Sequence, residues 1–255
     1  MFDQRNERWA LVAGGSGGVG SAVSRSLASD GWDIIVTYRA NEDAANKVVA
    51  DVQGHGRKAW TLQVDLTSPA SARSAIASAV ERAPLSGVVY AAGPHIPMKY
   101  VVDQAPEDFA DTIDADLKGA YNILQPSLRH LRETGGPIVA VVTPAINRYA
   151  KKDVLSSAPK AGVQAVVRAI AAEEGRFGVR ANCIAVGLLE GEGMWKELIA
   201  RGDYTPEMLD IAKRNIALRR FGDVGDIGEA AAFLMSNRAG WISAQTLTVD
   251  GGYTV

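Results

Sequence analysis

Residues 13–20 read Ala13-Gly14-Gly15-Ser16-Gly17-Gly18-Val19-Gly20. The apolar run Trp9–Ala13 leads into this turn and is predicted to be a strand, and the pattern after the turn predicts a helix. Glycines let a backbone approach a ligand closely, and a helix N-terminus offers unpaired N–H groups to a phosphate. A strand, a glycine-rich turn and a helix in this order therefore predict a site for the diphosphate of a dinucleotide.

Short strand-like runs alternate with helical patterns along the whole chain. The predicted strands are Trp9–Ala13, Asp33–Tyr38, Ala59–Val64, Gly87–Ala91, Ile138–Val142, Arg180–Val186 and Thr246–Val249. Apolar residues recur at steps of three and four in one helical pattern, at Phe109, Ile113, Leu117, Ala120, Leu124, Leu128 and Leu131. Alternating strands and helices favour parallel pairing with right-handed crossovers. We expect an α/β fold: one Rossmann-like, doubly wound domain over residues 1–255, with a seven-stranded parallel sheet and helices on both faces.

Charge and composition exclude several other classes of protein. The formal net charge is −2, from 27 basic and 29 acidic side chains, with no long run of either sign. Nothing therefore indicates a nucleic acid or membrane partner. The single cysteine, Cys183, lies in an apolar strand-like run and is predicted to be a core thiol rather than a nucleophile. With no apolar stretch long enough to span a membrane, we expect a cytoplasmic protein.

The segment from Leu188 to about Leu218 interrupts the regular alternation of strands and helices. It begins with glycines and continues with a helical pattern. Because it leaves the carboxyl end of a strand, we expect it to cover a substrate. Its apolar side chains, which predict either an apolar ligand or simple core packing, are Met194, Trp195, Leu198, Tyr204 and Met208.

The glycine spacing carries a family resemblance. Gly14, Gly18 and Gly20 follow Gly-x-x-x-Gly-x-Gly, which resembles the short-chain dehydrogenase/reductase family. Further matching motifs are Asp65-Leu66-Thr67, Ala91-Ala92-Gly93, Lys160-Ala161-Gly162 and Asp250-Gly251-Gly252. The resemblance implies an oxidoreductase with a nicotinamide cofactor and no metal site. The cofactor-binding residues it implies are Gly14, Ser16, Gly17, Gly18, Val19, Gly20, Tyr38, Arg39, Asp65, Leu66, Ala92, Gly93, Lys160, Gly187 and Leu189.

The end of the second predicted strand bears on the choice of nicotinamide. A site for NAD usually places a carboxylate there to bind both ribose hydroxyls. This chain has Tyr38 and then Arg39, whose planar guanidinium suits a 2′-phosphate. We predict that NADP(H) is preferred over NAD(H). The alternative is that Arg39 is an ordinary solvated loop residue.

The residues at the family's catalytic positions depart from the family pattern. Family reductases use a Ser or Thr, then a Tyr that donates a proton, then a Lys four residues beyond the Tyr. Here Thr143 and Lys160 occupy the first and last positions, while Ser156 stands in place of the tyrosine. An aliphatic alcohol is far less acidic than a phenol and is a poor general acid near pH 7. The family's supporting Asn is Asp116, which either assists the site or bonds to backbone within its own helix.

The 2,4-dienoyl-CoA reductase branch of the family also has a Ser four residues before the Lys. By partial resemblance to that branch, we predict reduction of a conjugated C=C in an enone or enoyl thioester. Thr143, Ser156 and Lys160 are then expected to stabilise the enolate, with Tyr149, His95 or water supplying the proton. Two alternatives remain open: a carbonyl reductase with a substitute proton donor, and a homologue that binds cofactor without catalysis.

Partners are also implied by the resemblance. The substrate is expected to be a small, apolar carbonyl or enoyl compound, with a thioester among the candidates. Family members commonly form tetramers, so we expect a homotetramer or homodimer. The helices over Pro106–Arg132 and Ser156–Phe177 are predicted to form one isologous contact.

Overall fold

The computed structural model describes residues 7–191, 195, 199–202 and 205–255. Its centre is a seven-stranded sheet with the order β3-β2-β1-β4-β5-β6-β7, and every neighbouring pair is parallel. The strands are β1 (Trp9–Ala13), β2 (Asp33–Tyr38), β3 (Ala59–Gln63), β4 (Leu85–Tyr90), β5 (Pro137–Val142), β6 (Arg180–Val186) and β7 (Thr246–Val249). The predicted seven-stranded parallel fold is confirmed.

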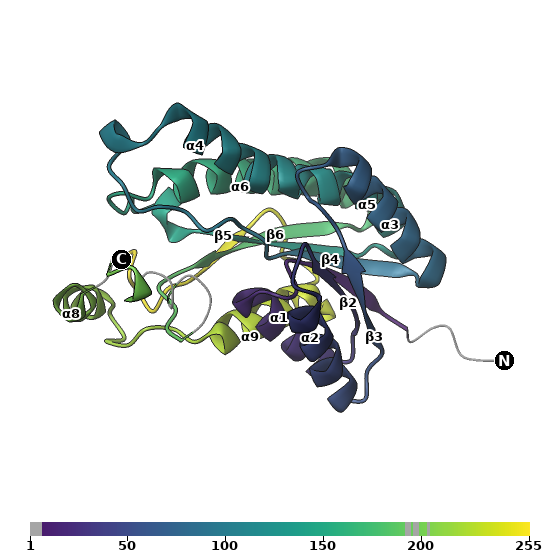
Figure 1. The fold of residues 1–255 in the computed structure, drawn as a ribbon. Coiled ribbons are helices and arrows are strands. Elements are labelled where there is room, and N and C mark those ends of the chain that lie inside the picture. The colour runs from purple at the N-terminus through teal and green to yellow at the C-terminus, as the bar shows by residue number, and fades with distance from the viewer. Residues whose placement is uncertain (1–6, 192–194, 196–198, 203–204) are drawn as a thin grey trace.

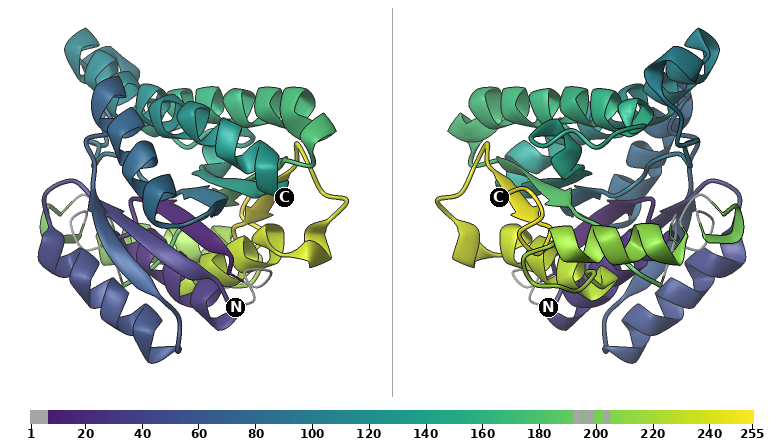
Figure 2. Two further views of the ribbon diagram at one scale, coloured as in Figure 1. Left: turned by 90° about the vertical axis from the view of Figure 1, so that its right-hand side faces the viewer. Right: turned by 90° about the vertical axis from the view of Figure 1, so that its left-hand side faces the viewer.

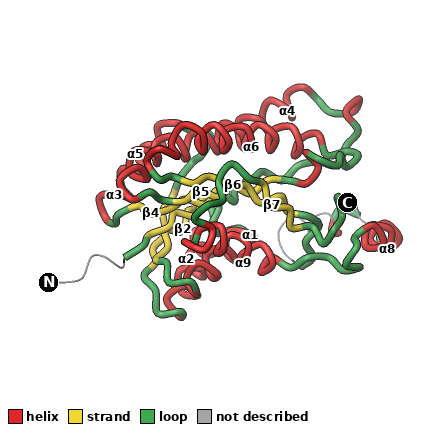
Figure 3. The backbone as a smooth tube through the Cα atoms, turned by 180° about the vertical axis from the view of Figure 1, so that it is seen from behind, coloured by secondary structure: helices red, strands yellow, loops and turns green. Residues whose placement is uncertain are grey.

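Helices cover both faces of the sheet (Figure 1). One layer holds α3 (Pro69–Arg82), α4 (Pro106–Thr112), α5 (Gly119–Thr134) and α6 (Val154–Glu174), and the other holds α1 (Gly18–Ser29), α2 (Glu42–Gly54) and α9 (Val224–Met235). The two side views in Figure 2 show the sheet between these layers. The short α8 (Pro206–Asn215) lies apart from both, beside the C-terminus (Figure 3). No helix in the described part of the chain is both long and apolar enough to cross a membrane.

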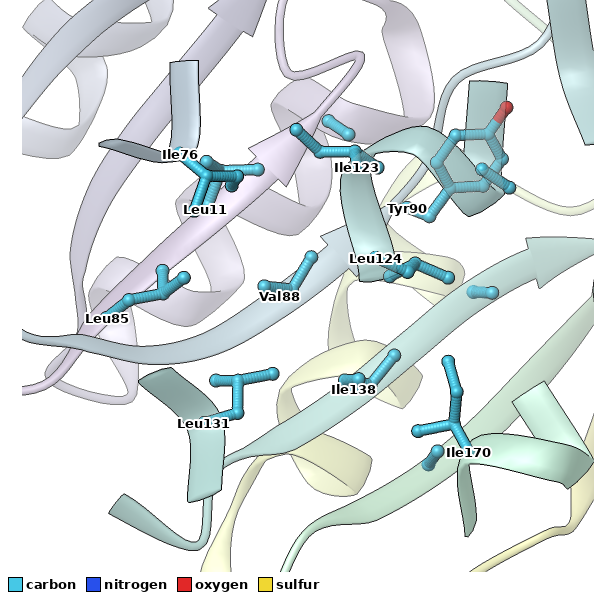
Figure 4. Packing of buried hydrophobic residues seen from close by; sticks show 14 of the residues in the cluster. Leu11, Ile76, Leu85, Val88, Tyr90, Ile123, Leu124, Leu131, Ile138 and Ile170 are labelled. Carbon is cyan, nitrogen blue, oxygen red and sulfur yellow. The ribbon is translucent and has the colours of Figure 1, made fainter. Parts of the chain in front are cut away.

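The central strands β1, β4 and β5 are largely apolar because both of their faces are buried. In β1, Leu11 packs with the α3–α5–α6 layer, whereas its neighbours Ala10 and Val12 pack with the α1–α2–α9 layer. Figure 4 shows the first of these cores, where strand residues such as Val88 meet helix residues such as Leu124. Side chains alternate between the two faces of a strand, so a strand covered on both sides cannot alternate in polarity.

Strand boundaries shift by one or two residues from the sequence prediction, most clearly in β4. This strand begins at Leu85 rather than Gly87, because Leu85 pairs with Trp9 across a register irregularity. This pairing could not be predicted from the sequence, since Ser86 and Gly87 interrupt the apolar run.

The helix predicted over Pro106–Arg132 contains a π-helical turn, Ile113–Lys118, between α4 and α5. A π-helical turn takes up more residues than an α-helical one and so rotates the buried face of the helix. As a result Asp116 is buried, while Ile113 and Leu117 are only partly buried. This turn brings an acidic side chain into the interior.

The strand order reverses between β1 and β4, since β1 connects outward to β2 whereas β4 leads toward β5. In open α/β sheets, ligands bind beyond the carboxyl ends of the strands at such a switch point. The glycine-rich turn after β1 and the Ala91–Gly93 segment after β4 meet at this place.

Candidate active site

A cavity of about 440 Å³ opens at the switch point. It is bounded by the segments that follow β1, β2, β3 and β4. Of the residues predicted to bind the cofactor, those that line it are Gly14, Ser16, Gly17, Tyr38, Arg39, Asp65, Leu66, Ala92 and Gly93. Residues from four separate segments therefore converge on one crevice, as the motif order predicted.

The glycine-rich turn has the shape that a diphosphate requires. Gly14 has φ +77°, its N–H donates to Thr37 Oγ1 at 3.1 Å, and a Cβ there would lie 2.8 Å from the Ala92 backbone. A Cβ at Gly20 would lie 2.2 Å from the Gly14 carbonyl oxygen. Gly17 caps α1 without a side chain, so the first N–H groups of the helix remain available to a ligand.

Asp65 is held in place by its neighbour Thr67. Its Oδ1 accepts from the Thr67 N–H at 3.0 Å and from the Thr67 hydroxyl at 2.7 Å. The Thr67 hydroxyl and N–H, in that order, lower the pKa of this carboxyl, and the charge of Arg39 adds a smaller contribution. Asp65 is thus a fixed carboxylate whose other oxygen can accept from an adenine amino group.

Tyr38, the last residue of β2, and Arg39, which follows it, differ in their surroundings. Burial, followed by the charge of the Glu42 carboxylate, raises the pKa of Tyr38. Arg39 is exposed, and its backbone carbonyl accepts from Gln63 Nε2 at 3.0 Å. Its guanidinium forms no ion pair with any residue that the structure describes. A cation at the rim of the cavity is therefore available to a ligand.

A second cavity, of about 270 Å³, adjoins the first. Its lining includes Gly18, Val19, Asp116, Ser156 and Lys160, and it shares Gly17 and the 91–95 segment with the first cavity. The shared walls make one crevice that runs from the β2–β3 side to the start of α6. This is the space expected for the nicotinamide end of a dinucleotide.

Lys160 is the buried cation of this second cavity. Its Nζ donates to Asp116 Oδ1 at 2.9 Å and to the Ala92 carbonyl oxygen at 3.0 Å. An ammonium has three donors, so one N–H remains for a ligand hydroxyl. Asp116 thus forms an ion pair with the lysine instead of bonding to backbone within its own helix.

Tyr90 completes the cluster around Asp116. Its hydroxyl donates to Asp116 Oδ1 at 3.0 Å and to the Asp116 carbonyl oxygen at 2.9 Å. Burial, followed by the charge of Asp116, raises the pKa of Tyr90 well above its ordinary value. Lys160 Nζ also lies 5.1 Å from the centre of the Tyr90 ring. The phenol is locked in its neutral, donating form and holds the carboxylate in place.

Ser156 lies in the first turn of α6, on the wall of the second cavity. Asp153 is the N-cap residue of that helix, and its side chain makes no capping hydrogen bond. Burial raises the pKa of Asp153 to about 7, and the Ser156 hydroxyl opposes this rise. The hydroxyl that replaces a phenol therefore lies one helical turn from a carboxyl whose pKa is raised by burial.

Comparison with known proteins identifies the family. The model described as enoyl-(acyl carrier protein) reductase matches residues 13–254. The chain belongs to the short-chain dehydrogenase/reductase family. Members of this family are oxidoreductases that use a nicotinamide cofactor, and the prediction of an NAD(P)H-dependent oxidoreductase is confirmed.

Two relatives of this short-chain oxidoreductase are named for different substrates. A 1-cyclohexenylcarbonyl-CoA reductase from Streptomyces collinus is 27% identical over 246 residues, covering 96% of this chain and 86% of the relative. A 3-oxoacyl-[acyl-carrier-protein] reductase from Staphylococcus epidermidis is 28% identical over 246 residues, covering 95% of this chain and 97% of the relative. A short-chain type dehydrogenase/reductase from Mycobacterium ulcerans has a similar structure, with a TM-score of 0.89 at 25% identity, over 98% of this chain and 90% of that one.

Two of the predicted catalytic residues of this family member, Thr143 and Tyr149, are not among the residues that line the crevice. Thr143 caps the 3₁₀ turn Pro144–Ile146, and its Oγ1 accepts from the Ala145 N–H at 3.2 Å. Tyr149 is 53% exposed. Neither lines the two cavities, whereas His95 lines both. In this structure Ser156 and Lys160 are the predicted catalytic residues that face the crevice.

The predicted cofactor-binding residues after β6, Gly187 and Leu189, do not line either of the two adjoining cavities. A Cβ at Gly187 would lie 2.6 Å from Asp250 Cα, and Leu189 lines a third cavity of about 510 Å³. Leu189 forms a parallel bridge with Gly222, which fixes the start of the predicted substrate cover. Met194, Leu198 and Tyr204 of that cover lie outside the described residues. The rings of Trp195 and Phe221 pack edge-to-face, with 4.8 Å between their centres. Met208 is 47% exposed on α8.

Asp153 and Tyr90 were not predicted from the sequence to lie near the site. Asp153 stands three residues before Ser156, a spacing that places the two on one side of a first helical turn and could have indicated the pair. Tyr90 gave no such signal, because it reads as one more apolar residue of a buried strand.

Proposed function

We propose that this short-chain oxidoreductase uses NADPH to reduce a conjugated C=C bond of an enone or enoyl thioester. The observation that carries the proposal is the pair of changes around Lys160. Ser156 replaces the phenol, and the ammonium is paired with Asp116 at 2.9 Å. A lysine that is neutralised by a carboxylate is less able to acidify a neighbouring hydroxyl. Such a site is poorly equipped for direct protonation of a ketone.

Alkene reduction makes a smaller demand on a general acid. The bound reduced nicotinamide supplies a hydride, which adds to the β-carbon of the substrate. The protein then has to stabilise the negative charge shared by the α-carbon and the carbonyl oxygen. Ser156 lines the crevice, where its hydroxyl would donate to that oxygen, while Lys160 keeps one N–H that would bind the ribose of the cofactor.

The relatives support both of the possible reactions. The family model and the Streptomyces relative are named for enoyl and cyclohexenylcarbonyl substrates, which favours reduction of C=C. The Staphylococcus relative is named for a 3-oxoacyl substrate, which favours the carbonyl alternative. Since the identities are 27% and 28%, similarity alone does not choose between them, and the chemistry of Ser156 carries the choice.

The proposed preference for NADPH depends on Arg39. The glycine-rich turn and Asp65 fit the diphosphate and adenine of either dinucleotide. Arg39 is exposed at the rim of the same cavity, where its guanidinium can bind a 2′-phosphate. The last residue of β2 is Tyr38, where a site for NAD would usually have a carboxylate.

The proposed oligomer joins two copies through the layer that holds α4, α5 and α6. Phe109, Tyr121 and Phe177 are exposed on these helices or just after α6, at 39%, 55% and 37%. Large apolar side chains at an exposed helical surface favour a contact with a second copy. Sedimentation equilibrium at micromolar concentration tests this, and a monomer would contradict it.

A paired substrate screen tests the reaction. Purified protein is given NADPH with cyclohexenone or cyclohexanone, and with crotonyl-CoA or acetoacetyl-CoA, and products are identified by mass. We expect NADPH oxidation with the unsaturated member of a pair and a product two hydrogen atoms heavier. Turnover of the ketones alone would replace the proposal by carbonyl reduction, and Tyr149→Phe would then test the substitute donor. Tight NADPH binding without turnover across a broad panel would indicate a protein that binds cofactor without catalysis.

A further inference from the structure

We propose that Asp116 sets the preference of the crevice between the two redox forms of its cofactor, by offsetting the charge of Lys160 beside the nicotinamide ring. The carboxylate would stabilise the oxidised ring, which is cationic, relative to the reduced ring, which is neutral. This inference goes beyond the proposed function, because it concerns the binding of the cofactor alone. It does not depend on which double bond of a substrate is reduced.

Asp116 and Lys160 are the acidic and basic side chains on the wall of the second cavity. Apart from the histidine His95, the other described residues that line it carry no ionisable side chain. Asp116 Oδ1 and Lys160 Nζ are 2.9 Å apart, so their charges nearly cancel at a distance. Arg39 and Asp65 line the first cavity instead, where the adenosine end of the dinucleotide is expected. The charge that the nicotinamide ring meets is therefore decided mainly by one ion pair.

Both charges of this ion pair are fixed in place. Asp116 and Lys160 are buried, and each has a second hydrogen-bond partner. Lys160 Nζ also donates to the Ala92 carbonyl oxygen at 3.0 Å, and the buried Tyr90 hydroxyl donates to Asp116 Oδ1 at 3.0 Å. Water screens buried charges much less than exposed ones. The field of the pair therefore acts on whatever occupies the second cavity.

The two redox forms of a nicotinamide differ by one charge on the ring. The reduced ring is neutral, and loss of a hydride, which is a proton with two electrons, leaves one positive charge on it. An ammonium without a counter-charge would repel the oxidised ring and leave the affinity for the reduced ring almost unchanged. Asp116 removes that repulsion. The diphosphate, the riboses and the adenine are common to both forms, so their contacts cancel in the ratio of the two affinities.

The same carboxylate favours donation of the hydride. Positive charge grows on the ring as the hydride leaves, and a fixed charge of opposite sign stabilises that transition state. The family's asparagine at this position would leave Lys160 without a counter-charge, whereas Asp116 supplies one. The departure from the family pattern at Asp116 therefore suits a protein that works in the direction of reduction.

A purely structural role for Asp116 makes a different prediction. The hydrogen bonds from Lys160 and Tyr90 require an acceptor oxygen, and the amide of an asparagine would also offer one. If Asp116 served only to hold these side chains, its loss would weaken the binding of both redox forms equally. If its charge acts on the ring, the loss weakens the binding of the oxidised form more. The ratio of the two dissociation constants separates these roles.

The test measures the dissociation constants of NADP⁺ and NADPH by calorimetry, without substrate. We expect Asp116→Asn to raise the ratio of the NADP⁺ constant to the NADPH constant about tenfold. Unit charges about 10 Å apart change a binding constant by about this factor at an effective dielectric constant of about 20. NAD⁺ and NADH should show the same rise, because the ring is the same. Asp114→Asn removes a carboxylate from an exposed pair with Lys118 and should leave the ratio unchanged.

Two further variants separate charge from position. Tyr90→Phe removes a hydrogen bond but no charge, so it should weaken the binding of both forms together and keep the ratio. Lys160→Met removes the ammonium and should lower the ratio, which gives a test of opposite sign if Asp116→Asn does not fold. A ratio unchanged in Asp116→Asn and Lys160→Met, or raised as much in Tyr90→Phe, overturns the proposal. A protein that binds both forms but reduces no alkene would overturn only the proposed function.

Discussion

Lys160 Nζ lies 2.9 Å from Asp116 Oδ1, and both side chains are buried. The carboxylate comes from the π-helical turn and the ammonium from α6, so the pair ties two helices together at the wall of the crevice. Tyr90 donates to the same Asp116 oxygen at 3.0 Å. Lys160 is thus paired with a carboxylate that Tyr90 also holds in place.

Removal of the Asp116 carboxylate should destabilise the protein strongly. Asp116→Ala leaves the Lys160 ammonium buried without a counter-charge and should lower the free energy of unfolding by about 3–5 kcal/mol. Asp116→Asn also removes the counter-charge but keeps an oxygen that can accept from Lys160 and Tyr90, so its cost should be smaller by about 1–2 kcal/mol. Urea unfolding measures both. Asp114→Ala, in an exposed pair with Lys118, is the control and should change the free energy by less than about 0.5 kcal/mol. Equal losses for Ala and Asn would show that the hydrogen bonds do not matter.

Removal of the Arg39 guanidinium should change the choice of cofactor. Arg39→Ala should weaken NADPH binding by about tenfold or more and leave NADH binding nearly unchanged, because NADH lacks the 2′-phosphate. Fluorescence titration with each dinucleotide measures the two dissociation constants. Arg73→Ala, an exposed arginine on α3, serves as the charge-matched control. An equal loss of affinity for NADPH and NADH in Arg39→Ala would mean that Arg39 does not bind the 2′-phosphate.

The stability of the protein should depend on pH through Asp153. Its pKa is raised from 3.8 to about 7, so the folded state binds more protons than the unfolded state between these values. Stability is therefore lost as pH rises through that window, and the cost is complete above about 7. Asp153→Asn removes the cost and should raise the free energy of unfolding by about 2–4 kcal/mol at pH 8 relative to the wild type. The gain should shrink toward pH 4. Denaturant unfolding at several pH values measures this, and a pH-independent difference would contradict it.

A single methyl group at Gly14 should damage the cofactor site. Gly14→Ala places a Cβ 2.8 Å from the Ala92 backbone at φ +77°, where both the contact and the conformation are unfavourable. We expect a loss of about 2 kcal/mol or more in stability, with at least about tenfold weaker dinucleotide binding. Gly54→Ala is the matched control, since nothing lies within 4 Å of its Cβ at the end of α2. That variant should be neutral or slightly stabilising, and binding as in the wild type by Gly14→Ala would show that the turn can shift.

Much of the crevice could be predicted from sequence because its residues are set by local rules. The Gly14–Gly20 turn, Asp65 and Ala92-Gly93 each follow a strand directly, and parallel strands bring their carboxyl ends to one edge. The π-helical turn could not be predicted, because its sequence fits an ordinary amphipathic helix. Without that turn, the burial of Asp116 was not apparent.

By itself the amino-acid sequence determined the parallel α/β architecture, the position of the dinucleotide turn and the loss of the tyrosine at Ser156. These follow from periodicity, glycine spacing and residue identity, which act over a few residues. Only the tertiary structure decided that Asp116 neutralises Lys160, that Tyr90 fixes Asp116 and that the Asp153 side chain does not cap its helix. The physical reason is that burial and hydrogen-bond partners are set by elements distant in the chain, and these control the charge on each group.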